Sequence, residues 1–237
     1  MGAILFDWPY TGLAVTPMML AAFAVARRAP DALPRFRDPA LVLPLLWPMY
    51  LIHQFEEHGV DLLGRRYAFL GELCAVLGSA NDPGGCPADP AFIFAVNGVG
   101  CQIAFVLALA FRRKRPLVAA CAWGIPLVNA VTHVASAIAH GQYNPGLLTS
   151  VILFAPMCAW MLHTVLKAGV IERRQVPRIV ATGVLVHAVL LGSLMLHARG
   201  WLSREGLLFV NGANGLWPLV LGRIGVPKIA PAVVPAS

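Results

Sequence analysis

The chain has 237 residues, of which 58% are hydrophobic and 12% are charged, and its mean hydropathy is +0.71. Soluble domains carry about 25% charged residues, so this composition excludes an ordinary soluble protein and predicts a polytopic membrane protein. The formal net charge of +7 does not indicate nucleic-acid binding, because the basic residues form short clusters between apolar runs rather than one basic face.

Seven apolar segments follow one another along the chain, and none alternates in the manner of a transmembrane β-strand. A helix needs about 20 residues to cross the hydrocarbon core, so the middle segments are long enough while the first and last are marginal. We expect an all-α transmembrane bundle of six to seven spanning helices, forming one domain over residues 1–225, with a disordered tail at residues 226–237. The segments cover residues 11–26, 40–58, 91–111, 116–139, 147–167, 178–198 and 206–222.

The basic residues predict the orientation of this bundle. With the N-terminus outside and one crossing per segment, fourteen of the eighteen Lys and Arg residues fall in inside loops, in agreement with the positive-inside rule. The first ten residues include Asp7 and no basic cluster, so we expect a retained first helix rather than a cleaved signal peptide. The expected inside residues are Arg27, Arg28, Arg35, Arg37, Arg112, Arg113, Lys114, Arg115, Lys167, Arg173, Arg174, Arg178, Arg223 and Lys228.

The longest predicted outside loop covers residues 59–90. Its first half is typical of a short helix lying at the membrane interface, and its second half is rich in turn residues. Cys74 and Cys86 both lie in this loop, and a disulfide between them remains open if the loop faces an oxidising compartment. The other cysteines lie within apolar segments, where we expect packing residues: Cys101, Cys121 and Cys158.

Most polar side chains within the apolar segments fall in one outer layer. His53, Glu56 and Glu57 end the second segment at spacings of three and four residues, which places them on one side of a helix. Asn129 and His133, four residues apart, lie in the outer half of the fourth segment. Imidazole and carboxylate groups on two such faces suit zinc, manganese or iron. Simpler roles compete, because the glutamates would also mark the helix end, and Asn129 with His133 would suit an interhelical hydrogen bond.

For the remaining histidines of the segments we expect structural rather than catalytic roles. His58 lies outside the three- and four-residue spacings, so we expect it to face the membrane interface. His163 and His187 stand alone in their segments and are expected to pack against neighbours or cap a helix. The outer layer also contains Asn97, His197, Asn211 and Asn214.

Our first hypothesis is a metal-dependent, hydrolase-like enzyme that acts on a lipid or another membrane-embedded substrate. Glu56 would act as general base on a metal-bound water, and the phenol of Tyr143 would reach toward His133 as a donor or oxyanion stabiliser. Two alternatives stay open: a metal-free acid/base enzyme such as an isoprenoid cyclase, and a small cation or proton transporter, which would need polar groups through both leaflets. The metal ligands would be His53, Glu57, His133 and, more weakly or as an orienting group, Asn129.

The stretch His53-Gln-Phe-Glu56-Glu57 resembles the motif of the HXXEE family of prokaryotic integral membrane proteins. A second signature of that family resembles Asn129-Ala-Val-Thr-His133, followed by Tyr143-Asn-Pro-Gly146 and Ser150. The resemblance implies a bacterial inner-membrane location and no settled activity. It also implies that the motif residues, with Tyr143, Pro145 and Gly146, share one site, although Pro-Gly is equally turn chemistry. Intramembrane CAAX-type proteases offer only a mechanistic analogy, because here the histidine precedes the glutamate pair.

Overall fold

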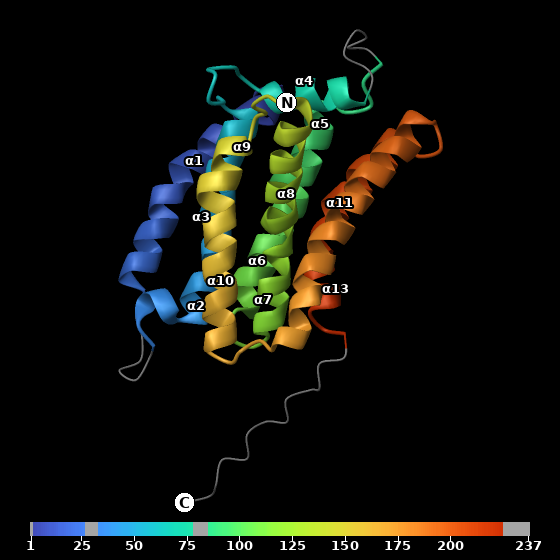
Figure 1. The fold of residues 1–237 in the computed structure, drawn as a ribbon. Helices are drawn as coiled ribbons and strands as arrows, with labels where there is room; N and C mark the ends of the chain where they lie inside the picture. Colours follow the sequence, from blue (N-terminus) through green and yellow to red (C-terminus); the bar gives the residue numbers. More distant parts are fainter. Residues whose placement is uncertain (1, 27–32, 78–84, 225–237) are drawn as a thin grey trace, which may run out of the picture.

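The computed structural model describes residues 2–26, 33–77 and 85–224, and within them the chain forms helices and one isolated β-bridge between Val60 and Arg66. The all-α prediction is therefore confirmed. Figure 1 shows the long helices side by side in one elongated bundle, with the short α4 (Ala68–Val76) across one end. We call this the α4 end. The expected disorder of residues 226–237 concerns positions outside the described residues.

Within the described residues, five helical segments are long and apolar enough to cross a membrane: Ile4–Val25, Pro90–Phe111, Pro116–His140, Leu147–Lys167 and Arg173–Ala198. The predicted segments at 40–58 and 206–222 are helical as well but are not among these five. In chain order the elements are α1 (Gly2–Val25), η1 (Arg35–Arg37), α2 (Pro39–Val42), η2 (Leu43–Leu45), α3 (Leu46–His58), α4, α5 (Pro90–Ile93), η3 (Phe94–Gly100), α6 (Cys101–Phe111), α7 (Pro116–Ala122), α8 (Gly124–His140), α9 (Leu147–Thr149), η4 (Ser150–Phe154), α10 (Ala155–Lys167), η5 (Arg173–Gln175), α11 (Val176–Ala198), α12 (Arg204–Ala213), η6 (Asn214–Leu216) and α13 (Trp217–Leu221).

The first helix starts at Gly2, well before the expected residue 11, so its predicted marginal length is wrong. The expectation failed because Pro9 normally interrupts a helix by removing the hydrogen bond to the carbonyl four residues earlier. Here the hydroxyl of Tyr67 donates to that carbonyl, on Leu5, at 3.2 Å. A tertiary contact therefore satisfies the backbone group that the proline leaves without its helical partner.

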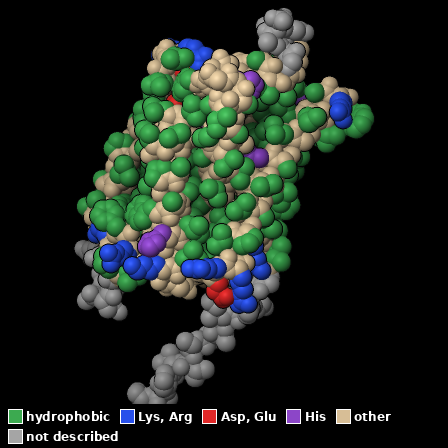
Figure 2. Space-filling model, in the orientation of Figure 1, with side chains coloured by type: hydrophobic (Ala, Val, Ile, Leu, Met, Phe, Trp, Pro, Cys, Tyr) green, Lys and Arg blue, Asp and Glu red, His purple; other side chains and the backbone are tan. Residues whose placement is uncertain are grey.

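The end of the bundle opposite α4 is filled by apolar side chains. Val42, Leu43 and Leu46 pack there against Trp123, which is fully buried. The indole N–H of Trp123 donates to the carbonyl of Leu43 at 2.9 Å. Figure 2 shows hydrophobic side chains covering the visible middle of the bundle, with Lys and Arg gathered at this end.

Glycine pairs bring helices into backbone contact at two crossings. A Cβ added at Gly183 of α11 would lie 2.0 Å from the carbonyl oxygen of Gly124 in α8. A Cβ added at Gly215 would lie 1.8 Å from the carbonyl oxygen of Gly100. From the first crossing, α11 leans away from α8 toward the α4 end (Figure 1). The small residues thus allow α8 and α11 to touch at this crossing, while the two helices lie apart at the α4 end.

The segment at the α4 end is held by covalent and ionic contacts. Cys74 and Cys86 form a disulfide with a Cα–Cα distance of 5.5 Å, which ties α4 to the segment that precedes α5. Arg65 pairs with Asp61 at 2.7 Å and with Glu72 of α4 at 3.1 Å. The predicted short helix in this loop is confirmed. The expected packing role of the three remaining cysteines is confirmed as well, since all are buried and free: Cys101, Cys121 and Cys158.

Candidate metal centre

Three buried side chains from two helices converge at the α4 end of the bundle. His53 and Glu57 come from α3, and His133 comes from α8. Glu57 Oε1 lies 3.0 Å from His133 Nε2 and 3.4 Å from His53 Nε2. Each residue offers one ligand atom, and these atoms all lie within 4.8 Å of one another. The spacing of four residues on α3 places its two members on one helix face, as expected.

Gly146 allows the two imidazoles to approach each other. Its φ of +95° is one that L side chains rarely adopt. A Cβ at this position would lie 2.6 Å from His133 Cε1 and 2.8 Å from His53 Cε1. The backbone between α8 and α9 therefore runs directly against both rings. The Pro-Gly turn is part of the wall of the site, which agrees with the grouping that the family resemblance implies.

The hydrogen bonds of Asn144 fix which nitrogen of His133 carries the proton. The amide Nδ2 of Asn144 donates to the His133 carbonyl at 3.0 Å, so its Oδ1 faces His133 Nδ1 at 2.6 Å. An amide oxygen only accepts, so His133 Nδ1 is the donor. The lone pair of neutral His133 is then on Nε2, directed at Glu57.

The same reasoning fixes the proton of His53. The Thr149 hydroxyl has one hydrogen, which it donates to the carboxylate of Glu56. His53 Nδ1 lies 2.7 Å from that hydroxyl oxygen and must therefore donate to it. The Nε2 of neutral His53 again carries a lone pair. This atom is buried and has no hydrogen-bond partner among the described residues.

Glu57 is held in place by its other carboxylate oxygen. The amide Nε2 of Gln54 donates to Glu57 Oε2 at 2.6 Å, which leaves Oε1 directed at the two histidines. Two imidazole lone pairs and one carboxylate oxygen thus share a buried space. Acceptors that face each other repel, so the arrangement requires either a shared proton or a cation among them. Two histidines and one carboxylate form a ligand set that suits zinc with a fourth position left for water.

Glu56, the expected general base, has its oxygens occupied. Its Oε1 accepts from the Tyr143 hydroxyl at 2.8 Å and from the Leu148 N–H at 3.0 Å. Its Oε2 accepts from the Thr149 N–H at 2.8 Å and from the Thr149 hydroxyl. The residue is buried and does not line the cavity beside the site. These contacts make it an anchor between α3 and the start of α9.

Tyr143 lies between the α4-end loop and Glu56 rather than against His133. Its hydroxyl accepts from the Leu62 N–H at 3.1 Å and donates to Glu56. Burial raises the pKa of this phenol, and the hydrogen bond and negative charge of Glu56 raise it further. The expected donation from Tyr143 to His133 is therefore wrong, and the contact at that ring is instead with Asn144, whose Oδ1 accepts from His133 Nδ1.

The expectation that His58 faces the membrane interface is wrong. The ring is 1% exposed and packs against Trp8, Tyr67 and Phe69. Its Nε2 lies 3.6 Å from Glu57 Oε2 and accepts from Asn97 at 3.3 Å. α1 and the loop after α3 fold over the helix end and cover it, a tertiary effect that helical spacing does not report.

The other members of the predicted polar layer mostly join helices. Asn211 donates to Ser193 at 2.9 Å and Asn214 donates to the Val186 carbonyl at 2.8 Å. His197 bonds the Leu202 carbonyl at 2.8 Å at the end of α11. The buried Oδ1 atoms of Asn129, Asn211 and Asn214 have no hydrogen-bond partner among the described residues, and of these three asparagines Asn129 alone lines the cavity beside the site.

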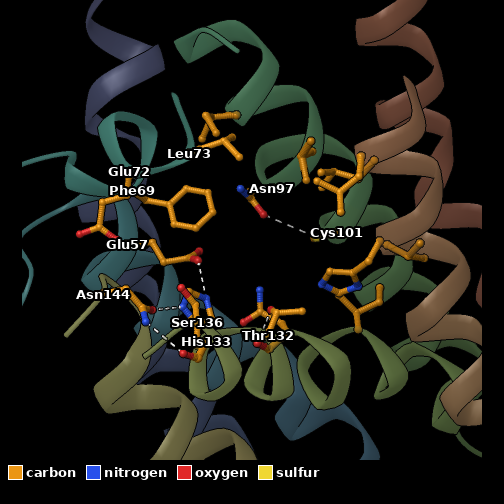
Figure 3. A pocket seen from close by; sticks show the side chains of 18 of the residues that line it. Glu57, Phe69, Glu72, Leu73, Asn97, Cys101, Thr132, His133, Ser136 and Asn144 are labelled. Carbon is orange, nitrogen blue, oxygen red and sulfur yellow. Dashed lines mark hydrogen bonds and ion pairs between the residues drawn. The ribbon is translucent and has the colours of Figure 1, made fainter. Parts of the chain in front are cut away.

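A cavity of about 230 Å³ adjoins the convergent group, and Glu57 and His133, but not His53, are among its lining residues. Figure 3 shows Glu57, His133 and Asn144 on one side of it, with Phe69 and Leu73 of α4 above and Asn97 opposite. Asn129 and His187 also line it, so His187 faces an internal space and bonds the Gly183 carbonyl at 2.8 Å. The cavity runs between α4, η3, α8 and α11.

Three residues that orient the site were not singled out from the sequence, namely Gln54, Asn144 and Thr149. Gln54 stands inside the His53–Glu57 motif, and Asn144 stands inside the Tyr143–Gly146 turn. For Gln54 and Asn144 the position within a motif was the available signal, whereas Thr149 lies outside these motifs. Amide and hydroxyl groups are common in turns and helix ends for local reasons, which hides such a role.

Residues 44–161 match the model of a family described as "Protein of unknown function with HXXEE motif". The match confirms the resemblance seen in the sequence, and it includes every residue of the convergent group. No curated protein and no solved structure shows significant similarity to the chain.

Proposed function

Because this chain belongs, over residues 44–161, to the HXXEE-motif family of unknown function, we propose its function from the site itself: a metal-dependent, hydrolase-like membrane enzyme. The observation that carries the proposal is the meeting of three lone-pair donors, His53 Nε2, His133 Nε2 and Glu57 Oε1, within 4.8 Å. Zinc, manganese and iron accept imidazole and carboxylate ligands.

The surrounding hydrogen bonds support a ligand role over a packing role. Both Nδ1 atoms donate, one to Asn144 and one to Thr149, which directs both Nε2 lone pairs inward. Metal-binding histidines typically donate their other N–H to such a partner. When bound, a divalent cation would supply an activated water and polarise a substrate carbonyl. The chain's own contribution is to orient the ligands, and Asn129 adds an unpaired amide oxygen on the cavity wall.

We place the α4 end outside, in the orientation that the positive-inside rule favours. The site would then lie in the outer part of a bacterial inner membrane, next to a cavity with mostly apolar walls. The inward path meets the apolar core around Trp123. That core supports an enzyme over a transporter, because a conduction path needs polar groups along its length.

Elemental analysis of detergent-purified protein tests the proposal, after expression with zinc, manganese and iron supplied. His187→Ala is the matched control, because His187 lines the same cavity outside the convergent group. We expect about one metal per chain in the wild type and in this control, and none in His53→Ala or His133→Ala. A wild type without metal would refute the ligand assignment and leave the metal-free acid/base enzyme.

A further inference from the structure

The cavity reaches the surface of the protein between two helices. Three of its lining residues are also exposed: Thr132 on α8, Leu191 on α11, which is 47% exposed, and Val76 on α4, which is 73% exposed. These residues surround an opening between α8 and α11, beneath α4. α8 and α11 cross at Gly124 and Gly183 and separate toward the α4 end (Figure 1), which explains the position of the opening.

The outer surfaces of α8 and α11 are apolar. Val131 and Ile138 on α8 are 61% and 77% exposed, and Val184 and Met195 on α11 are 53% and 51% exposed. Side chains of this kind, on helices that cross a membrane, face the hydrocarbon chains of lipids. A ligand that uses the opening therefore arrives from the bilayer and not from water.

The charges of the cavity restrict which lipid fits. Among the described residues, no Lys or Arg lines the cavity, and the carboxylates there are those of Glu57 and Glu72. The nearby Arg65 is already paired with Asp61 and Glu72. Phosphate groups are held in proteins by Arg, Lys or helix N-termini. In the metal-free chain a lipid phosphate in this cavity would face carboxylates, so the ligand that the chain's own groups accept carries no negative charge.

The size of the cavity restricts the ligand further. At about 230 Å³ it is smaller than the roughly 300–1,000 Å³ of pockets for drug-sized molecules. A small polar group with the first part of one hydrocarbon chain fits such a space, and the rest of that chain extends through the opening into the bilayer. The two chains of a diacyl lipid do not fit side by side. A helical peptide, about 10 Å wide or more, is also too large. The apolar walls suit the chain, and they include Val96, Phe92, Val186 and Leu190.

We propose that this cavity binds an uncharged single-chain lipid, an acyl or prenyl compound whose ester, amide or alcohol group lies beside Glu57 and His133. The polar wall offers neutral partners for that group, since Asn97, Asn129 and Thr132 line the cavity. That the bound lipid is a substrate rests on the proposed function. Its binding does not, because the opening, walls and charges are those of the chain itself.

Native mass spectrometry of the purified full chain, treated with EDTA, tests the proposal with two matched probes. These are 1-oleoylglycerol and 1-oleoylglycerol 3-phosphate, which differ only in the phosphate. We expect one 1-oleoylglycerol per chain, and at least about tenfold weaker binding of the phosphate, because a buried charge without a partner is costly. Equal or tighter binding of the phosphate would overturn the proposal, as would preferential binding of an apolar helical peptide.

Paired tryptophan substitutions locate the bound probe. Leu191→Trp narrows the opening and should weaken 1-oleoylglycerol binding at least about tenfold, since the larger side chain takes the space that the ligand needs. Val184→Trp, on the exposed face of the same helix and away from the cavity, should bind as the wild type does. If Leu191→Trp does not fold, Thr132→Trp narrows the opening from α8 instead. Unchanged binding in the folded variant contradicts the proposal.

Metal removal in this assay keeps it independent of the metal analysis. A protein that binds no metal but takes up 1-oleoylglycerol refutes the proposed metal centre and retains the lipid site. A protein that holds metal but shows no preference for the uncharged probe retains the proposed metal centre and refutes the lipid site.

Discussion

Gly146→Ala should remove the metal from the proposed centre through steric displacement alone. The added Cβ would lie 2.6 Å from His133 Cε1, 2.8 Å from His53 Cε1 and 2.9 Å from His133 Nε2. Non-bonded carbon atoms rest about 3.5–4.0 Å apart. Both rings, or the turn itself, must therefore move by roughly 1 Å, whereas metal–ligand distances tolerate about 0.2 Å.

The substitution has a second cost, because the backbone of Gly146 has φ +95°. A non-glycine residue in such a conformation costs on the order of 1–3 kcal/mol. Gly141→Ala separates the two effects. Gly141 also has a positive φ, +65°, but a Cβ there would meet nothing within 4 Å. Both variants should lose thermal stability, and only Gly146→Ala should lose metal.

The assay combines elemental analysis with a melting curve in detergent for wild type and both variants. We expect about one metal per chain in Gly141→Ala and less than about a tenth of that in Gly146→Ala, given the displacement of two ligands. Full metal content in a folded Gly146→Ala protein would refute the view that this turn sets the ligand geometry. Loss of metal from both variants would assign the effect to general destabilisation.

Three further predictions concern single side chains. Glu56→Gln places an amide N–H donor against the N–H groups of Leu148 and Thr149, and it should destabilise the fold by about 1–3 kcal/mol in thermal or chemical unfolding while metal content is retained. Unchanged stability together with lost activity would restore the general-base role. Gln54→Ala frees Glu57 Oε2 and should lower metal affinity about 10–100-fold in a chelator competition titration, and unchanged affinity contradicts the orienting role. Burial raises the pKa of Asp89, but hydrogen bonds from Arg204 and a backbone N–H outweigh this and hold it below its usual value. The stability that this ionised carboxylate contributes is present above about pH 4 and is lost as the pH falls through the lowered pKa. The difference in melting temperature between the wild type and Asp89→Asn should therefore disappear in acid, and a difference that stays constant with pH refutes the prediction.

The local pattern of the chain was sufficient for much of the fold. Apolar runs of about 20 residues become helices because the backbone must satisfy its own hydrogen bonds in lipid. The spacing of His53 and Glu57 placed them on one face for the same local reason. His133 lies next to them in the structure, at the depth that its position in the neighbouring polar layer indicated.

Several features depended on the packing of distant segments. His58 is buried because α1 and the loop after α3 cover it. These segments are not neighbours of His58 along α3, so the three- and four-residue spacing does not indicate the contact. The tautomers of the histidines depend on Asn144 and Thr149, which arrive from the turn and helix that follow α8. The cavity exists because α11 separates from α8 beyond one glycine crossing.

The two adjacent glutamates show where local inference ends. Consecutive residues on an α-helix point about 100° apart, so Glu56 and Glu57 cannot serve the same site from the same direction. The spacing from His53 led us to expect both glutamates on one side of the helix, with Glu57 as a metal ligand and Glu56 as general base. Only the tertiary structure separated their roles, because the N–H groups of Leu148 and Thr149 lie on the side of Glu56, and α8 brings His133 to the side of Glu57.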